Sequence, residues 1–299
     1  MFRKIVAVED PLINDEARKA LHDFAQQVII YNDSPLSEDE LICRIGDADA
    51  VLVTFKTQIG RKAIEASPQL KYIGMCCTLF ESCCNVDLKA TREAGIVVTG
   101  VRDYGDDGVV EYAISEVVRY LHGFGERQWR DRKYELGGMK VGVVGLGKTG
   151  RMTADAFLLF GSEVHYYSRS RKPEAEEEGI GYLPLDDLLA TCDIIMTTLP
   201  RNTMLLKERE FGIIGNGKIL INTSIGPTFD VEAMKRWLVN NPDSSYFCDG
   251  TGMGTLRDEL APYRNVFYTP AVAGMSVQST GRLSKKVLDN IRQYMDENN

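Results

Sequence analysis

The sequence has few histidines, no surplus of basic residues and no long apolar run. Each shortage argues against one class of function. Three histidines occur among 299 residues, so a mechanism built on this side chain has few candidates. The chain has 35 Lys and Arg against 43 Asp and Glu, and this charge of -8 argues against binding to a nucleic-acid backbone. The apolar run before Glu9 is too short for a signal peptide, and no stretch approaches the roughly 18 apolar residues of a membrane span. We therefore expect a soluble, cytoplasmic protein that binds neither nucleic acid nor membrane.

Cysteine is present without the pattern of a disulfide framework. Seven cysteines is an odd number, and a chain of this length can bury a large core unaided, which favours a reducing compartment. Cys76, Cys77, Cys83 and Cys84 cluster in the segment MCCTLFESCC. Neighbouring cysteines rarely reach one metal ion without strain, so we predict no zinc or iron-sulfur site. Buried thiols and a redox switch both remain open.

Short apolar runs alternate with amphipathic patterns, which is typical of parallel α/β sheets. The first hundred residues give predicted strands at 4–8, 28–30, 50–53, 72–74 and 96–98. The predicted helices are 12–27, one that opens at the Ser37 capping box, 61–66, 86–94 and 109–121. From Lys140 onward, predicted strands are 141–144, 164–167, 193–197, 218–222, 246–248 and 266–269, and 277–295 is an amphipathic helix. Six strands suit a dinucleotide-binding sheet, and the last helix could pack on the first lobe.

A glycine motif stands between the first strand of this second run and the helix after it. The segment VGVVGLGKTG places Gly145, Gly147 and Gly150 in the spacing G-x-G-x-x-G. In a dinucleotide site the first glycine allows a tight turn, the second lets the backbone approach a pyrophosphate, and the third lets the helix pack on the strand. The alternative is a glycine turn with a purely structural role.

The end of the next strand lacks the acid that an NAD site uses to bind the ribose 2′-hydroxyl. The segment there reads Ser168, Arg169, Ser170, Arg171 and then Lys172, a hydroxyl followed by cations. This composition suits a 2′-phosphate, so we predict NADP(H) as the cofactor, with NAD as a further possibility. The alternative is an exposed basic turn without a role, and the segment 174–178 is predicted to be a solvated acidic turn.

Several segments in order resemble the D-2-hydroxyacid dehydrogenase family: YGDDGVVEYAISEVVRYLHG, VGVVGLGKTG, CDIIMTTLPRNT, GKILINTSIG and NVFYTPAVAG. The resemblance covers nearly the whole chain. It implies a flavodoxin-like substrate lobe, residues 1–103 plus 276–299, and a Rossmann nucleotide-binding lobe, residues 104–275, both α/β with doubly wound parallel sheets. It also implies an active site where the lobes meet, a small-molecule substrate, and a homodimer formed through the nucleotide lobes.

The resemblance also assigns cofactor contacts. It places them in the glycine loop, after the second strand, and in the loops that follow later strands of the nucleotide lobe. The residues are Gly145, Gly147, Lys148, Thr149, Gly150, Ser168, Arg169, Ser170, Arg171, Leu199, Pro200, Asn202, Thr223, Ser224, Ile225 and Asp249. Leu199 and Pro200 offer an apolar wall for a ribose or adenine, and Asp249 occupies the position of an acid that faces the nicotinamide amide.

The catalytic residues depart from the family pattern. Ile225 stands where the family has its substrate-binding arginine, and Ala271 stands where it has its catalytic histidine. Gly254 falls where the orienting glutamate is expected, although Glu259 could be a displaced equivalent. Neither an isoleucine nor an alanine can bind a carboxylate by paired N–H groups or exchange a proton.

A proton donor must therefore come from elsewhere, and the candidates near the implied cleft are Lys56, Tyr104, Asp106 and Tyr112. Packing at the hinge is the alternative for both tyrosines, and a plain surface cation is the alternative for Lys56. The cysteine-rich segment aligns with the loop that meets the substrate carboxylate in relatives.

Two functions fit these features. The first is an NADP(H)-dependent oxidoreductase that acts on a small carbonyl, imine or alkene with catalytic residues unlike those of its relatives. The second is a catalytically silent protein that senses NADP(H) and passes closure of its lobes to a partner. Ile225 bears on the choice, because an apolar plug beside the nicotinamide would favour the sensor.

Overall fold

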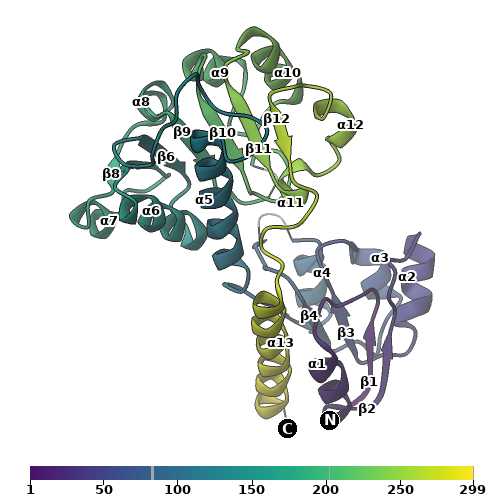
Figure 1. Ribbon diagram of the computed structural model, residues 1–299. Helices are drawn as coiled ribbons and strands as arrows, with labels where there is room; N and C mark the ends of the chain where they lie inside the picture. Colours follow the sequence, from purple (N-terminus) through teal and green to yellow (C-terminus); the bar gives the residue numbers. More distant parts are fainter. Residues whose placement is uncertain (82–83, 202, 299) are drawn as a thin grey trace. The chain divides into compact units, whose positions relative to one another are not determined.

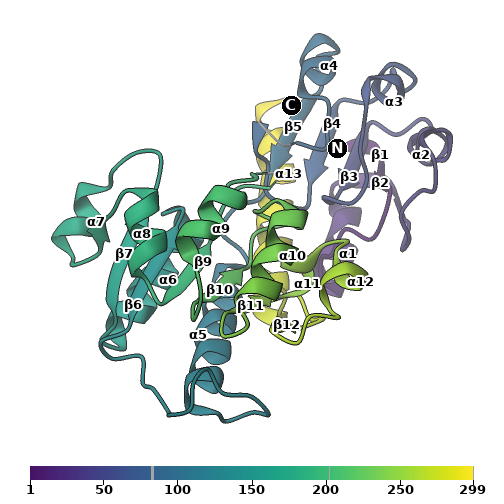
Figure 2. The ribbon, with the colours of Figure 1, turned by 90° about the horizontal axis from the view of Figure 1, so that it is seen from above.

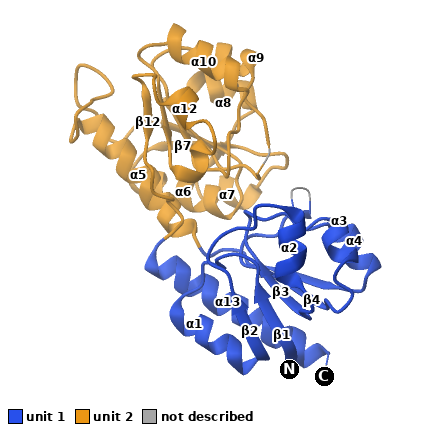
Figure 3. Cartoon of the chain, turned by 90° about the vertical axis from the view of Figure 1, so that its right-hand side faces the viewer, with its two compact units in different colours: residues 1–104, 276–299 blue, residues 105–275 orange. Residues whose placement is uncertain are grey.

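The computed structural model describes residues 1–81, 84–201 and 203–298. The chain forms two compact units (Figure 3): unit 1 comprises Met1–Tyr104 and Ser276–Asn299, and unit 2 comprises Gly105–Met275. Each unit contains one sheet whose described strands all run parallel. The predicted α/β class with two doubly wound sheets is therefore confirmed.

The sheet of unit 1 has five strands in the order β2-β1-β3-β4-β5, the order of flavodoxin-like folds. Its strands are β1 (Phe2–Ala7), β2 (Ala25–Ile30), β3 (Ala50–Val53), β4 (Tyr72–Met75) and β5 (Val97–Gly100). Its helices are α1 (Asp15–Ala20), α2 (Glu38–Ile45), α3 (Arg61–Glu65), α4 (Leu88–Glu93) and α13 (Val277–Glu297) (Figure 1).

Alternating side chains of these strands build two cores. Val6, Val51 and Ile73 pack with α2, α3 and α4 on one face of the sheet. Their neighbours Ile5 and Leu52 pack with α1 and α13 on the other face. Because successive strand residues point to opposite faces, the apolar runs of a doubly covered sheet show no alternation in sequence.

The first predicted helix is wrong in its length. Instead of covering 12–27, α1 ends at Ala20, a 3-10 turn covers Leu21–Asp23, and Ala25 already begins β2. Pairing decides this boundary, because β2 lies parallel to β1 with Ala25 opposite Phe2. Hydrogen bonding to a strand more than twenty residues away overrides the local helical pattern.

Helix α13 completes unit 1 although it lies at the far end of the sequence. Leu283, Val287 and Ile291 are buried in the core that contains α1 and β1, and the Tyr294 ring stacks on Phe2 with centroids 5.4 Å apart. The Ser276 hydroxyl caps the helix by accepting the N–H of Ser279. Unit 1 therefore depends on a segment that follows unit 2 in the chain.

We expect Ile291→Ala to lower the free energy of unfolding of unit 1 by about 2–5 kcal/mol, the usual cost of emptying a fully buried aliphatic site. Ile291 is 0% exposed. Urea unfolding followed by circular dichroism measures the change. Gln293→Ala, on the exposed side of the same helix, is the control and should stay near the wild type. Equal stability of the two variants would show that α13 does not contribute to the core.

The sheet of unit 2 has seven strands in the order β12-β11-β10-β9-β6-β7-β8. They are β6 (Lys140–Val144), β7 (Glu163–Tyr167), β8 (Gly181–Tyr182), β9 (Ile194–Thr197), β10 (Ile219–Asn222), β11 (Ser245–Cys248) and β12 (Val266–Tyr268). The order reverses between β6 and β9, as in dinucleotide-binding sheets. The sequence predicted six of these strands and missed β8, which is too short at two residues to show a period.

The helices of unit 2 are α5 (Asp106–His122), α6 (Lys148–Leu159), α7 (Pro173–Glu177), α8 (Leu185–Thr191), α9 (Glu208–Ile214), α10 (Val231–Asn240), α11 (Gly250–Met253) and α12 (Arg257–Leu260). Helices α5 and α6 share one core with one face of the sheet, and α8, α9 and α10 share the other (Figure 2). Among the described residues, no helix combines the length and apolarity needed to cross a bilayer.

Candidate functional site

The glycine loop lies between β6 and α6, at the carboxyl end of the parallel sheet. Gly145 has φ +101°, and a Cβ there would lie 2.6 Å from the carbonyl oxygen of Thr198. A Cβ on Gly150 would lie 2.0 Å from the Gly145 carbonyl oxygen, so close packing requires glycine at both positions. Gly147 differs, because a Cβ built on it has no neighbouring atom within 4 Å. The loop therefore closes on itself around two glycines and leaves space beside the third.

Helix α6 presents unsatisfied N–H groups next to this space. Its N-cap is Gly147, which has no side chain to accept them, and its first turn contains no acidic residue. The first N–H groups of a helix lack partners within it and carry partial positive charge. An anion such as a pyrophosphate would fit there, and a purely structural turn would not require this space.

Thr149 and Asp106 connect the loop to α5. The Thr149 hydroxyl donates a hydrogen bond to the Asp106 carboxylate, which lies in the first turn of α5. The same region packs tightly, since a Cβ on Gly108 would lie 2.2 Å from the carbonyl oxygen of Ala273. Asp106 thus holds the glycine loop in place, and its role as a proton donor stays a prediction.

The two arginines in the basic segment after β7 differ in their partners. The Arg171 guanidinium donates to Glu176, with Nε to Oε1 at 3.0 Å, and lies 4.9 Å from the centre of the Tyr182 ring. Arg169 is exposed and forms no ion pair with any described residue. The Ser168 hydroxyl donates to the Ser170 carbonyl and so shapes the turn. Of these two arginines, Arg169 is the one available to an incoming phosphate.

The predicted acidic turn at 174–178 is in fact helix α7, with Pro173 as its first residue. Proline is favoured at this position because it lacks an N–H group, and an N–H group there would have no partner within the helix. Glu176 faces inward from α7, where it accepts from Arg171 and from the Tyr166 hydroxyl at 2.9 Å. The acidic segment therefore binds part of the basic segment, which the sequence reading treated as independent.

The loop after β9 lies beside the glycine loop, because the Thr198 hydroxyl donates to the Gly145 carbonyl, and it is bonded in turn to the loop after β10. The Leu199 N–H donates to the Ser224 Oγ at 2.9 Å, and that hydroxyl donates to the Thr197 carbonyl at 3.2 Å. Leu199 is half-buried, while Pro200 is exposed and Thr223 half-buried. Asn202, also predicted to contact the cofactor, lies outside the described residues. Ser224 therefore joins the two loops and fixes the position of Leu199.

Asn222 supports these loops, a role that the sequence analysis did not predict. It is fully buried at the end of β10, where its Oδ1 accepts from the Thr197 hydroxyl at 2.9 Å. Its Nδ2 donates to the carbonyls of Gly226 at 3.0 Å and Gly252 at 3.1 Å. A polar residue that ends the apolar strand ILIN is the signal that could have identified it.

Asp249 is engaged within its own segment. It is 1% exposed and caps α11 by accepting the N–H of Gly252 at 2.7 Å. Its other oxygen accepts from the Thr251 hydroxyl at 2.7 Å and from the N–H of Ala273 at 2.9 Å. The carboxylate thus links α11 to the segment after β12, and its predicted contact with a nicotinamide amide would have to share these oxygens.

The positions to which the resemblance assigns an arginine, a glutamate and a histidine hold Ile225, Gly254 and Ala271. Ile225 is 39% exposed, so its side chain is not packed into a core. Gly254 ends α11 with φ +56°, and the exposed Ala271 uses its carbonyl to accept the N–H of Gly250 at 2.9 Å. Glu259 pairs with Lys235 on the surface, with Oε2 to Nζ at 2.5 Å, which gives it a different task from an orienting glutamate.

Tyr112 lies in the core of unit 2. Its hydroxyl is buried and forms no well-aligned hydrogen bond among the described residues, with Thr269 as its polar neighbour. Burial raises the pKa of the Tyr112 phenol far above its usual range, and the neighbouring Thr269 acts in the opposite direction. The phenol is therefore neutral at every physiological pH.

Lys56 and Tyr104 belong to unit 1. Lys56 is exposed in the loop after β3, and it forms no ion pair with a described residue. Tyr104 is half-buried and packs against the core that contains α13. Two of the four candidate proton donors, Lys56 and Tyr104, therefore lie in unit 1, and the other two, Asp106 and Tyr112, lie in unit 2.

Glu9 fixes the loop that carries Lys56, and the sequence reading did not single it out. It is 1% exposed, and its carboxylate accepts from the hydroxyls of Thr57 at 2.6 Å and Ser34 at 2.7 Å and from the N–H of Thr54 at 2.9 Å. Burial by itself would raise the pKa of Glu9, but these hydrogen bonds outweigh it and lower the pKa below its usual range. The ionised carboxylate therefore belongs to the folded state.

We expect Glu9→Gln to lower the free energy of unfolding by about 1–3 kcal/mol at neutral pH, because buried donors lose a charged acceptor. The folded-state pKa of Glu9 is lowered, so its contribution is complete above the ordinary value of 4.5 and is lost as the pH falls below it. Urea unfolding at pH 7 and at pH 4 measures this. The wild type should lose more stability on acidification than the variant, and Glu16→Gln, at an exposed site, should behave as the wild type. Equal losses in the wild type and Glu9→Gln would contradict the assignment.

The cysteines of the segment after β4 differ in environment. Cys76 and Cys77 are buried, and burial raises the pKa of the Cys76 thiol. The Cys84 Sγ donates to the Met75 Sδ at 3.5 Å, while Cys83 lies outside the described residues. Within the described part of the chain, no three His, Cys, Asp or Glu side chains gather as ligands of one metal ion would.

Comparison with known proteins gives one family match, two relatives by sequence and one structural neighbour. Residues 112–273 match the family described as D-isomer specific 2-hydroxyacid dehydrogenase, NAD binding domain. The chain is 25% identical over 291 residues to a hydroxypyruvate reductase of Blautia hydrogenotrophica, which spans 90% of this chain and 89% of the relative. A glyoxylate reductase of Thermococcus kodakarensis is 25% identical over 283 residues, spanning 86% and 83%. The fold also matches an acyclic imino acid reductase in complex with NADPH and D-Arg, with TM-score 0.83, 20% identity and coverage of 98% and 97%.

Proposed function

Because the chain belongs to the D-isomer specific 2-hydroxyacid dehydrogenase family, we propose that it is an NADP(H)-dependent oxidoreductase acting on a small carbonyl or imine compound with a non-standard catalytic residue. The cofactor assignment rests on the glycine loop and the start of α6. Gly145 and Gly150 are required by packing, whereas Gly147 and the uncapped start of α6 face open space in which a pyrophosphate fits.

The preference for a 2′-phosphate rests on the end of β7. The strand is followed by Ser168 and by Arg169, whose guanidinium has no carboxylate partner among the described residues. No acid stands there to accept a ribose 2′-hydroxyl, and an exposed guanidinium binds phosphate through paired N–H groups. NADPH is also the cofactor in the complex of the imino acid reductase that shares this fold.

A bound nicotinamide would supply the hydride, and the chain would bind the cofactor and deliver the proton. The loop N–H groups would hold the pyrophosphate, Arg169 the 2′-phosphate, and Leu199 the apolar wall of the pocket. An ordinary 2-oxoacid mechanism is disfavoured, since Ile225 and Ala271 replace the residues that would bind a carboxylate and protonate a carbonyl.

Lys56 is our choice as proton donor among the four candidates. Asp106 is bonded to Thr149, Tyr112 lies in a core, and Tyr104 packs against one. The Lys56 ammonium is exposed in the loop that Glu9 fixes and can donate a proton to a developing oxyanion or amide.

The first test is a calorimetric titration with NADPH and with NADH, followed by NADPH consumption in the presence of a panel of small carbonyl and imine compounds. NADPH should bind much more tightly than NADH, and at least one compound should be turned over. Equal affinities would remove the 2′-phosphate assignment. Tight NADPH binding without turnover of any compound would favour the NADP(H) sensor over the enzyme.

We expect Lys56→Met to lower kcat by about 100-fold or more on the compound that is turned over, the usual contribution of a general acid. The Kd for NADPH should not change, because the lysine belongs to unit 1 and the glycine loop to unit 2. Lys71→Met removes another exposed lysine of unit 1 and should leave kcat unaltered. If Lys56→Met kept the wild-type kcat, a group other than Lys56 would be the proton donor.

We also propose that two copies pair through unit 2. Phe124, Leu159 and Phe160 are exposed there, at 63%, 84% and 52%. Leu159 and Phe160 are adjacent at the end of α6, and contiguous exposed apolar surface often marks a protein interface. Light scattering should give the mass of a dimer, and Leu159→Glu should yield the monomer.

A further inference from the structure

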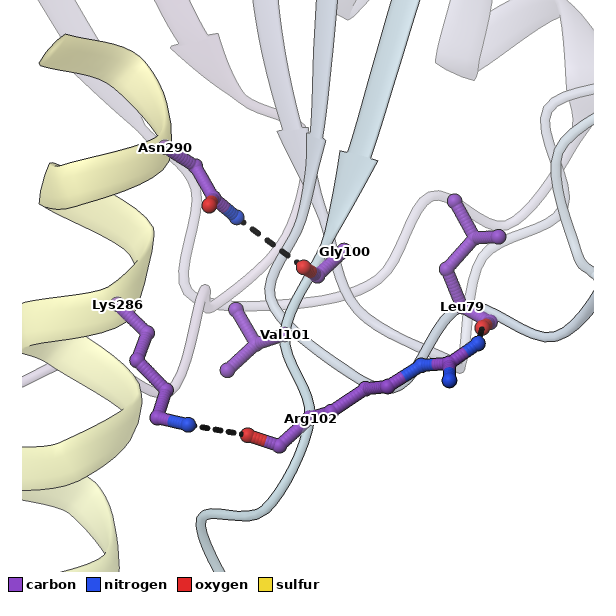
Figure 4. Close-up of a pocket in the computed structure, with 6 residues that line it drawn as sticks. All are labelled: Leu79, Gly100, Val101, Arg102, Lys286 and Asn290. Carbon is purple, nitrogen blue, oxygen red and sulfur yellow. Dashed lines mark hydrogen bonds between the residues drawn. The ribbon is translucent and has the colours of Figure 1, made fainter. Parts of the chain in front are cut away.

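Unit 1 contains a cavity that the nucleotide site does not use. It lies at the carboxyl end of β5, between that strand and α13, and has a volume of about 430 Å³ (Figure 4). Its lining residues are Leu79, Gly100, Val101, Arg102, Lys286 and Asn290. Ligand pockets often have volumes of about 300–1,000 Å³, and in parallel sheets they form at the carboxyl ends of the strands.

Two cations on this cavity are held by backbone carbonyls. The Lys286 Nζ donates to the Arg102 carbonyl at 2.7 Å, and the Arg102 guanidinium donates to the Leu79 carbonyl at 3.4 Å (Figure 4). Arg102 also lies over the Phe80 ring, 5.5 Å from its centre. An ammonium has three donors and a guanidinium five, so most of their N–H groups remain for a ligand.

No carboxylate in the described part of the chain neutralises the charge of this pair. Neither Arg102 nor Lys286 forms an ion pair with a carboxylate among the described residues. Other cations on α13 do so, since Lys285 pairs with Asp289 at 2.6 Å and Arg292 pairs with the same residue at 2.9 Å. A half-buried lysine beside an unpaired arginine, in a chain of net charge -8, leaves a local positive potential at the cavity.

Polar and apolar groups line the cavity together. The Asn290 Nδ2 donates to the Gly100 carbonyl at 3.1 Å, which fixes the amide on the cavity wall beside Lys286 (Figure 4). Leu79 and Val101 supply the apolar part of the lining. This combination suits a small organic molecule with one anionic group.

We propose that unit 1 binds a small carboxylate or phosphate compound in this cavity, with Lys286 and Arg102 as its anion-binding residues. The site goes beyond the proposed cofactor function, since all its residues belong to unit 1, whereas the glycine loop belongs to unit 2. It would take the anionic group on the two side chains and the remainder of the molecule against Leu79.

Calorimetric titrations of the full chain with pyruvate and with inorganic phosphate, at low ionic strength, test the proposal. At least one of the two anions should bind the wild type, and its identity distinguishes a carboxylate site from a phosphate site. Lys286→Gln and Arg102→Gln should each weaken that binding by about tenfold or more, the effect of losing a charge-assisted hydrogen bond. Lys286→Arg, which keeps the charge, should retain binding.

Lys285→Gln is the matched control, because Lys285 neighbours Lys286 on the same helix but pairs with Asp289. Its anion affinity should equal that of the wild type. Thermal unfolding of each variant checks that α13 stays docked, and NADPH titration, expected to be unaltered in all of them, separates this site from the cofactor site. Failure of both anions to bind, or equal weakening in Lys285→Gln and Lys286→Gln, would overturn the proposal.

Discussion

Gly147→Ala is expected to fold normally and to bind NADPH about tenfold or more weakly, because a methyl group would stand where the pyrophosphate meets the backbone N–H groups. Gly147 has φ -81° and ψ -165°, which alanine adopts without strain, and its Cβ position is open. The cost to folding should stay below about 1 kcal/mol, the loss of a favourable N-cap residue. Calorimetry with NADPH and thermal unfolding measure the two quantities separately.

Gly150→Ala should show the opposite behaviour. Its new Cβ would lie 2.0 Å from the backbone oxygen of Gly145, which cannot move without disrupting the turn. The free energy of unfolding should fall by about 1–3 kcal/mol, as in other overpacked sites. If Gly147→Ala bound NADPH as tightly as the wild type while Gly150→Ala was merely unstable, the loop would be a structural turn without a nucleotide.

Removal of Arg169 should strongly weaken binding of the cofactor's 2′-phosphate. Arg169→Gln is expected to weaken NADPH binding by about tenfold to a hundredfold, the loss of one or two charge-assisted hydrogen bonds, and to leave NADH binding nearly unaltered. The ratio of the two affinities, measured by nicotinamide fluorescence, is therefore the informative quantity. A parallel loss for both cofactors would mean that Arg169 contacts a group they share.

Arg171→Gln provides the comparison. Arg171 is already bound to Glu176 and lies over Tyr182, so its removal should alter the affinity ratio much less than removal of Arg169. A larger effect at Arg171 would show that α7 releases this arginine when the cofactor binds. Both substitutions are at exposed positions, so the fold should tolerate them.

The basic turn shows why a site read from sequence differs from the same site in three dimensions. In the sequence, Arg169, Arg171 and the acidic segment that follows are separate patterns of charge. Folding of α7 brings Glu176 to Arg171 and leaves Arg169 exposed. Spacing along the chain cannot show which charges neutralise each other, because that depends on the direction of each side chain.

Asn222 and Glu9 illustrate the same limit for buried polar groups. Both are buried, and each joins loops that lie far apart in sequence, Asn222 in unit 2 and Glu9 in unit 1. A buried polar residue is recognisable only through its partners, because an exposed one has the same letter in the sequence. Conversely, Asp249 was recognisable from a motif, yet the structure shows it bonded to α11 and to the N–H of Ala273.

The sequence alone determined the α/β class and the glycine motif, because apolar periodicity and the spacing of glycines are properties of a continuous segment. Through the resemblance it also predicts that Ile225 and Ala271 replace the family's arginine and histidine. The tertiary structure decided where the first helix ends, where β8 lies and which arginine stays unpaired. It also placed Arg102 and Lys286, 184 residues apart in sequence, on one cavity. These features depend on strand pairing and on side chains from distant segments, which meet only when the sheets and their covering helices have formed.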